Sequence, residues 1–230
     1  PGGAFFRHCE RIAASHCHAI SSVADAMTDQ LVAAGGAPRD KFTTIYSGME
    51  VEAFLNSAEH RDRTRRELGY NDTDVVVGKV ARLFHLKGHA DLVAAARQAC
   101  AGNPRLKFLL VGDGILRPKI EEQIAAAGLA DRFQFTGLVP PSRIPELLAS
   151  TDLVVHTSYR EGLARVLPQS LLAGRPVVSY DIDGAREVVH DAVTGYLVAP
   201  GDVATLAARI EQLAASPALR DELAFTGREQ

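Results

Sequence analysis

The chain has 230 residues, with 25 lysines and arginines against 28 aspartates and glutamates, so its formal net charge is −3. A nucleic-acid-binding protein usually shows a basic excess or a basic stripe, so this balance argues against that class of partner. Hydrophobic residues make up 47% and charged residues 23%, which is typical of a globular protein and argues against a disordered chain. No apolar run approaches the ~18 residues of a membrane span. Three irregularly spaced cysteines provide no disulfide framework and favour a reducing compartment.

The first 70 residues predict mostly helix. The sequence begins Pro1-Gly2-Gly3 without an initiator Met or a targeting segment, so we expect a piece of a longer protein. Residues 5–34 lack Pro and Gly and predict a helix, a short strand or turn at 19–23, and a second helix that ends at Gly35-Gly36. Residues 41–48 predict a strand running into a turn at Gly48, and residues 49–68 predict a linker followed by a surface helix.

From residue 74 the pattern changes to short apolar runs rich in Val, namely VVVGKVA, LKFLLVG, DLVVH, PVVSY and GYLVA. Between them lie helical segments at residues 91–101, 115–127, 144–150 and 165–173. Continuous apolar strands alternating with helices indicate an α/β fold, a Rossmann-like, doubly wound parallel sheet. Such sheets bind ligands beyond the carboxyl ends of their strands. The residues that follow each run are therefore the candidates for a functional site.

Two cations follow the first run, in a loop that precedes a helix. Arg82 and Lys87 lie five residues apart, and Gly88 permits a close turn. A guanidinium fork and an ammonium would suit a phosphate or a diphosphate. Solvated loop cations are the alternative interpretation of this loop taken alone.

Glycines follow the second run. Gly112 and Gly114 match the first two glycines of a dinucleotide fingerprint, but Arg117 stands where the third belongs. We therefore favour a tight turn at the end of a strand, with backbone close to a ligand as a further possibility.

A carboxylate follows the third run. Glu161 lies in the loop TSYREGLA, ahead of a helix with Pro168 in its first turn. The start of this helix would suit an anion, and Glu161 could accept hydrogen bonds from sugar hydroxyls. A simple charge at a helix N-terminus is the alternative.

Two metal sites are conceivable and both are disfavoured. Asp181 and Asp183 could ligate a divalent cation, but they stand in a turn where Asp serves as a turn or capping residue. Cys9 and His16 share a helical face, with His8, Cys17 and His18 nearby. Buried cysteine and surface histidine explain that cluster better than zinc.

In combination, these loops resemble the donor half of the family 4 (group 1) retaining glycosyltransferases. The motifs that carry the resemblance are ARLFHLKGH, FLLVGDG, FQFTGLV, SYREGLARVLPQSLLAGRPVVSYDIDGAREVV and TGYLVAPGD, over roughly residues 42–215. Members have two facing Rossmann-like domains, the GT-B architecture. The resemblance implies an incomplete acceptor-side domain at residues 1–46, a linker at 47–60, a donor-binding domain at 61–200 and C-terminal helices at 201–230.

The resemblance also assigns roles to residues. Arg82 and Lys87 match the pair that contacts the donor diphosphate, and Glu161 matches the first Glu of a Glu-(seven residues)-Glu motif that faces the donor sugar. The second Glu, which holds ribose hydroxyls, is replaced by Gln169. Further contacts with the donor are expected mainly from backbone atoms, and the positions concerned are Gly112, Asp113, Gly114, Gly137, Leu138, Val139, Gly162 and Leu163. Asp181 and Asp183 match a turn in the family.

The implied activity is transfer of a hexosyl group with retention from a UDP-, GDP- or ADP-sugar to an unknown acceptor, without a metal or another cofactor. The chain alone would be nearly inactive, since the acceptor side is incomplete. A non-hydrolysing sugar-nucleotide epimerase and a catalytically weakened nucleotide-sugar binding module remain alternatives. An NAD-dependent dehydrogenase is disfavoured by the incomplete fingerprint. We expect a cytoplasmic protein, with peripheral contact at the inner face of the membrane left open.

Overall fold

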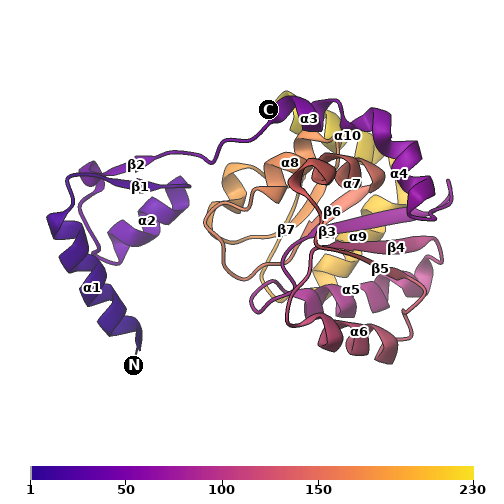
Figure 1. The fold of residues 1–230 in the computed structure, drawn as a ribbon, viewed down its shortest axis with the longest axis horizontal. Coiled ribbons are helices and arrows are strands. Elements are labelled where there is room, and N and C mark those ends of the chain that lie inside the picture. The colour runs from indigo at the N-terminus through magenta and orange to yellow at the C-terminus, as the bar shows by residue number, and fades with distance from the viewer. Residues whose placement is uncertain (1) are drawn as a thin grey trace.

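The computed structural model describes residues 2–230, apart from the side chains of residues 2–4 and 7. A small N-terminal unit comes first, made of α1 (Gly2–His16), β1 (Ile20–Ser22), α2 (Asp25–Ala33), η1 (Arg39–Lys41) and β2 (Phe42–Thr44). β1 and β2 pair in parallel, with Ile20 opposite Phe42. An extended segment joins this unit to the larger domain (Figure 1). The predicted order of helix, short strand, helix and strand is therefore found here.

The larger domain is built on a six-stranded parallel sheet, as the apolar runs predict. Its strands are β3 (Val75–Val80), β4 (Leu106–Val111), β5 (Phe133–Gly137), β6 (Leu153–His156), β7 (Val177–Tyr180) and β8 (Gly195–Val198), in the spatial order β5-β4-β3-β6-β7-β8. Val75 is opposite Leu106 in β4, and Val77 is opposite Leu153 in β6. The α/β, doubly wound fold is thus confirmed.

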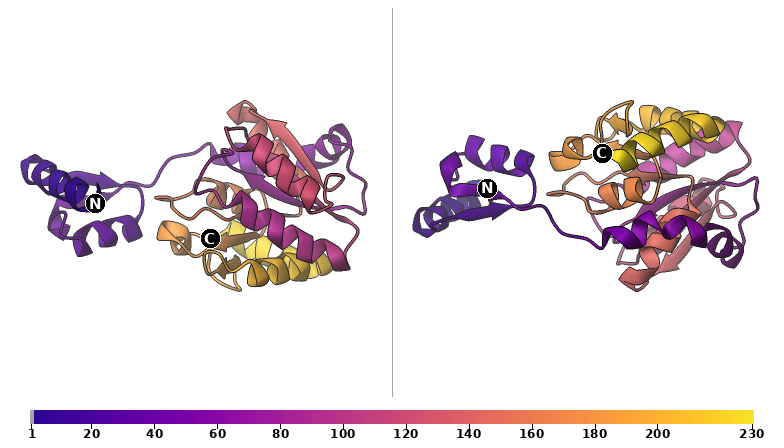
Figure 2. Two further views of the ribbon diagram at one scale, coloured as in Figure 1. Left: turned by 90° about the horizontal axis from the view of Figure 1, so that it is seen from below. Right: turned by 90° about the horizontal axis from the view of Figure 1, so that it is seen from above.

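Helices cover both faces of the sheet (Figure 2). On one face α5 (His89–Gly102), α6 (Arg117–Ala126), α9 (Val203–Ala215) and α10 (Pro217–Glu229) share the largest buried cluster. On the other face α3 (Val51–Leu55), α7 (Ile144–Ser150) and α8 (Val166–Leu172) pack against β6 and β7. Strands covered on both faces must be apolar on both faces, which explains the continuous Val runs.

The remaining short elements are η2 (Ser57–His60), α4 (Arg61–Glu67), η3 (Pro141–Arg143) and η4 (Asp183–Glu187). The segment 47–60, expected as a linker, contains α3 and η2. Asp183, expected in a turn, begins the 3₁₀ turn η4. No helix in residues 2–230 is long and apolar enough to cross a membrane.

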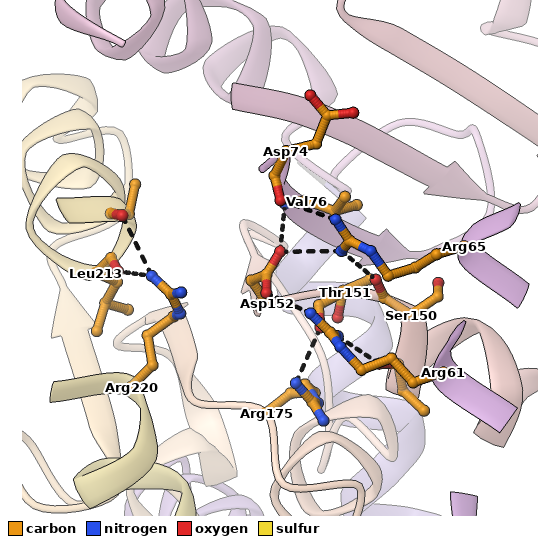
Figure 3. Close-up of polar contacts among 12 residues, drawn as sticks. Arg61, Arg65, Asp74, Val76, Ser150, Thr151, Asp152, Arg175, Leu213 and Arg220 are labelled. Carbon is orange, nitrogen blue, oxygen red and sulfur yellow. Dashed lines mark hydrogen bonds and ion pairs between the residues drawn. The ribbon is translucent and has the colours of Figure 1, made fainter. Parts of the chain in front are cut away.

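A buried ionic cluster holds the amino end of the sheet together (Figure 3). Asp152, just before β6, accepts hydrogen bonds from Arg61 at 2.6 Å, from Arg65 at 3.2 Å and from the backbone N–H of Val76 at 2.7 Å. Nearby, burial lowers the pKa of Arg175 to about 10, with the charge of Arg61 adding to the effect. One carboxylate therefore neutralises two arginines of α4 and ties that helix to β3 and β6.

We expect Asp152→Ala to destabilise the domain by about 3–5 kcal/mol, because it leaves buried guanidinium groups unpaired. Urea unfolding measures the loss. Asp131→Ala is the matched control, since its carboxylate is exposed and pairs with Arg132 at the surface. That change should cost less than about 1 kcal/mol. Equal losses in the two variants would contradict a structural role for the cluster.

Candidate active site

The sheet reverses its direction of growth between β3 and β6. The chain runs outward from β3 through β4 to β5, then returns to the other side of β3 to begin β6. The loops after β3 and β6 therefore leave the same sheet edge side by side, at the point where doubly wound sheets bind ligands. The expected residues Arg82 and Lys87 lie in the first loop and Glu161 lies in the second.

These two loops cross in direct contact at Gly88. A side chain at position 88 would place its Cβ 1.9 Å from the carbonyl oxygen of Thr157, and the φ of Gly88 is +60°. The Thr157 hydroxyl donates to the Gly88 carbonyl at 2.8 Å, and the Tyr159 N–H donates to the Leu86 carbonyl at 2.8 Å. Only glycine can occupy this crossing without moving backbone.

The crossing brings Lys87 and Glu161 together. The ammonium of Lys87 donates to Oε1 of Glu161, and the Ser158 hydroxyl donates to the same oxygen at 3.0 Å. Nε2 of His156 lies 3.8 Å from it. Each of these contacts falls on Oε1, so Oε2 is the oxygen that a ligand hydroxyl can approach.

Electrostatics keep Glu161 ionised. Burial alone would raise the pKa of this carboxyl, but the nearby His156 ring, the hydrogen bonds from Lys87 and Ser158 and the charge of Lys87 lower it to about 2. Burial also lowers the pKa of His156. The site therefore presents a carboxylate and an ammonium, an arrangement that can hold hydroxyls and an anion at once.

Arg82 lies apart from this pair. Its guanidinium is exposed and stacks on the ring of Phe84, 4.6 Å from the ring centroid. The loop below it is fixed, because the Leu83 N–H donates to the Asp113 carbonyl at 2.9 Å. The long side chain can thus turn toward a ligand while its backbone stays in place.

The glycines after β4 pack against the loop after β3. A Cβ at Gly112 or at Gly114 would lie 2.3 Å from the carbonyl oxygen of Ala81 or of Leu83. Asp113 accepts from the Gly114 N–H at 2.8 Å, and its other oxygen lies 3.5 Å from Arg117. A tight turn accounts for this loop, which is the interpretation favoured above.

The residues after β5 flank these glycines. The Gly112 N–H donates to the Gly137 carbonyl at 3.1 Å. Leu138 is exposed, whereas Val139 packs against a buried cluster with Leu109 and Leu147. Backbone at Gly112 and Gly137 therefore lies at the same sheet edge as the charged pair.

The N-terminal unit reaches the loop after β6. A Cβ at Gly162 would lie 2.8 Å from the side chains of Val23 and Met27, so these residues cover it, and the neighbouring Leu163 is half-buried. Asp183 accepts from the Glu161 N–H at 2.8 Å and from Gln30 at 2.9 Å. The position of Glu161 thus depends on residues from three parts of the chain.

Gln169 lines a cavity that the Lys87–Glu161 pair does not line. It lines a space of about 630 Å³ together with Met49, Pro141, Ser142 and Arg165. This cavity lies beside the helix that follows the Glu161 loop, and none of Arg82, Lys87 and Glu161 lines it. Gln169 is therefore set apart from the charged pair.

The two candidate metal sites have other arrangements. Asp181 forms an ion pair with Arg186, and Asp183 holds the loop of Glu161. α1 ends at His16, so Cys17 and His18 lie beyond the helix that was expected to carry them. In the described part of the chain, no three His, Cys, Asp or Glu residues gather as metal ligands.

Comparison with known proteins decides the family. The model of the family "Glycosyl transferases group 1" matches residues 60–230, three quarters of the chain. This chain belongs to the group 1 glycosyltransferases. The expected family is therefore confirmed, and the epimerase alternative is not favoured.

Curated relatives of this group 1 chain are longer than it is. It is 40% identical over 143 residues to 2-deoxystreptamine N-acetyl-D-glucosaminyltransferase of Streptomyces fradiae, which covers 61% of the chain and 34% of the relative. It is 30% identical over 210 residues to 2-deoxystreptamine glucosyltransferase of Streptomyces kanamyceticus, which covers 91% of the chain and 54% of the relative. The chain thus spans about half or less of the length of these relatives.

Solved structures agree on the fold. Anabaena Alr3699/HepE in complex with UDP-glucose superposes with a TM-score of 0.88 at 28% identity, over 100% of this chain and 64% of that one. Sucrose-phosphate synthase from Thermosynechococcus elongatus superposes with a TM-score of 0.86 at 24% identity, over 97% of this chain and 55% of that one. The domain is therefore the C-terminal half of a GT-B fold.

Several residues that contact the candidate site were not predicted from the sequence. Lys79 is buried in β3 and donates to Thr157 at 2.7 Å, while His156 and Ser158 contact Glu161. Lys79 carries a signal, because a lysine inside the run VVVGKVA must bury its charge. His156 ends the third run, at the edge where ligands bind.

The loop crossing can be tested with two Gly→Ala variants. Gly69 has a φ of +75° with no atom within 4 Å of a new Cβ, so Gly69→Ala should cost about 1–2 kcal/mol, the strain of a left-handed conformation. Gly88→Ala adds a clash with the Thr157 carbonyl, which should cost about 1–3 kcal/mol more. Urea unfolding compares the two, and equal losses would contradict the crossing.

Proposed function

We propose that this chain forms the donor site of a glycosyltransferase that transfers a hexosyl group with retention from a UDP-sugar to an acceptor. The observation that carries the proposal is the Lys87–Glu161 pair at the point where the sheet reverses, with the exposed guanidinium of Arg82 at the same edge. An ammonium for a diphosphate and a carboxylate for hydroxyls stand side by side there. A nucleotide-sugar is a ligand that needs both.

The chemistry that this site must assist is departure of the nucleoside diphosphate. As the bond from the anomeric carbon to the diphosphate breaks, negative charge grows on the leaving group. Lys87 and Arg82 would stabilise that charge from fixed backbone, which is the most effective kind of electrostatic catalysis. Glu161 would orient the sugar through Oε2, while Oε1 remains bound to Lys87.

The ribose, the base and the remaining phosphate contacts would involve residues around the charged pair. The ribose would lie near Gln169, whose amide can accept and donate hydrogen bonds to hydroxyls. The base would lie against backbone at Gly112 to Gly114 and at Gly137 to Val139. Backbone contacts to the sugar and phosphate would come from Gly162 and Leu163, once the covering residues Val23 and Met27 move aside.

A solved structural neighbour supports UDP as the nucleotide of the donor. Alr3699/HepE, at 28% identity and a TM-score of 0.88, was solved in complex with UDP-glucose. We extend that donor class to this chain as part of the proposal. Two cations would do the work of charge stabilisation, so we propose a reaction that needs no metal or other cofactor.

The cellular location is a proposal on separate grounds. Cys9, Cys17 and Cys100 are all free, which suits a reducing compartment. We therefore propose a cytoplasmic protein, with any contact at the inner face of the membrane made outside this domain.

Arg82→Ala should weaken binding of UDP-glucose about 10–100-fold, the loss expected for hydrogen bonds to a charged group. Isothermal titration calorimetry of this chain, with EDTA present, measures the change. Arg97→Ala is the matched control, because Arg97 is an exposed arginine on α5. In a protein that contains the acceptor side, Arg82→Ala should slow transfer ~10²–10³-fold. Unchanged binding and turnover would contradict the role of Arg82.

Gln169→Glu should tighten binding of UDP about 3–10-fold, because a charged acceptor makes stronger hydrogen bonds to ribose hydroxyls. The matched control is 2′-deoxy-UDP, which lacks one of those hydroxyls and should gain less. Calorimetry with both nucleotides measures the difference. An equal gain for both would mean that residue 169 does not hold the 2′-hydroxyl.

A further inference from the structure

Lys79 is a buried charge that the proposed reaction does not use. It lies in β3, its side chain is 1% exposed, and its amino group donates to Thr157 Oγ1 at 2.7 Å. Within residues 2–230 it forms no ion pair. An ammonium has three N–H groups to satisfy, and this one has a single hydrogen-bond partner.

Such burial disfavours the charged form. Removing an ammonium from water without a carboxylate partner carries a large desolvation cost. Burial and, to a smaller extent, the charge of Lys87 lower the pKa of Lys79, whereas Asp91 and Glu161 raise it, and the net pKa is about 7. Near neutral pH this amino group is therefore poised between its two forms.

Lys79 also lies directly beneath the loop crossing. Its partner Thr157 donates in turn to the Gly88 carbonyl at 2.8 Å. A chain of hydrogen bonds thus runs from the amino group in the sheet to the residue next to Lys87. This chain connects the charge of Lys79 to the loop where the donor would bind.

We propose that Lys79 is a positioning residue of the donor site, which takes up a proton when the donor binds and acts on the crossing loops through Thr157. This inference rests on the proposed function. The donor diphosphate brings two negative charges to the sheet edge where the loops after β3 and β6 meet. These charges favour the ammonium form of Lys79 over its amine form. The coupling is reciprocal, so protonation of Lys79 strengthens donor binding.

The sign of the pH dependence follows from this coupling. Lys79 loses its proton as pH rises through neutrality, so the affinity for donor should be higher at pH 6.5 than at pH 8.5. Several charged and titratable groups face Lys79. They are Lys87 in the loop after β3, His89 and Asp91 in α5, His156 in β6, and Glu161 in the loop after β6.

The other shifted groups do not mimic this effect. Burial lowers the pKa of His89 to about 4 and also lowers that of His156, so both are neutral above pH 6.5. Glu161, with its pKa lowered to about 2, is ionised throughout. UDP-glucose is a suitable probe, because its phosphates are diesters and lack the second ionisation of a phosphomonoester near roughly pH 6.

The test is calorimetric titration of this chain with UDP-glucose at pH 7.5, in two buffers that differ in enthalpy of ionisation. We expect uptake of a substantial fraction of a proton per donor bound, and none in Lys79→Met. With a pKa of about 7 in the free chain, the affinity should fall about sixfold between pH 6.5 and 8.5 if the donor raises the pKa of Lys79 by one unit, and about twentyfold if it raises it by two. Lys107→Met is the matched control, because Lys107 lies at the amino end of neighbouring β4 and donates to the Asp131 carbonyl.

The outcomes separate the two proposals. If the unaltered chain binds UDP-glucose without proton uptake, or if Lys79→Met shows the same uptake, the role of Lys79 is overturned and the proposed function stands. If the unaltered chain does not bind UDP-glucose, the proposed function falls and this inference falls with it. The first comparison uses the unaltered chain, so it does not depend on the folding of a variant.

A double-mutant cycle tests the route through Thr157. Thr157→Val removes the hydroxyl that joins Lys79 to the Gly88 carbonyl. If Lys79 acts through that hydroxyl, the combined variant should bind UDP-glucose no more weakly than Lys79→Met alone. Losses that add would contradict this route.

Discussion

The contact between Gly88 and Thr157 is the constraint on which the site depends. It exists because β3 and β6 are neighbours that the chain reaches by opposite crossovers, so their loops leave one edge of the sheet together. The absence of a Cβ at position 88 lets the loops touch. Lys87 directly precedes Gly88 in the first loop, and Glu161 follows Thr157 by four residues in the second. A carboxylate and an ammonium are thereby fixed as a pair by backbone geometry.

Much of the fold could be predicted because strands buried on both faces are apolar at most of their positions. β5 was missed as a strand because, unlike β8 at the other edge of the sheet, it is only half-buried throughout, and it contains Gln134. For the candidate site, the positions after the strands predicted Arg82, Lys87 and Glu161, and the structure brings Lys87 and Glu161 into contact while Arg82 stacks on Phe84. The contact of Lys79 with Thr157 and the cavity that Gln169 lines depend on packing between distant segments, which no local pattern encodes.

The site is also held by a residue that was expected to serve only as part of a turn. Asp183 binds the backbone of Glu161, and Gln30 of the N-terminal unit binds Asp183. Close by, the Glu187 carboxylate accepts hydrogen bonds from the first N–H groups of α2, at Asp25 and Ala26, where a helix favours negative charge. Contacts between the two units therefore bear directly on the loop that carries Glu161.

A crystal structure of this chain with UDP-glucose tests the central claim most directly. The account predicts the diphosphate at the edge shared by β3 and β6, within hydrogen-bond distance of Arg82 and Lys87, with a sugar hydroxyl on Glu161. The neighbouring hollow lined by Phe84, His89 and Tyr159 should stay empty. A nucleotide bound in that hollow, or one that leaves the Lys87–Glu161 pair untouched, would contradict the account.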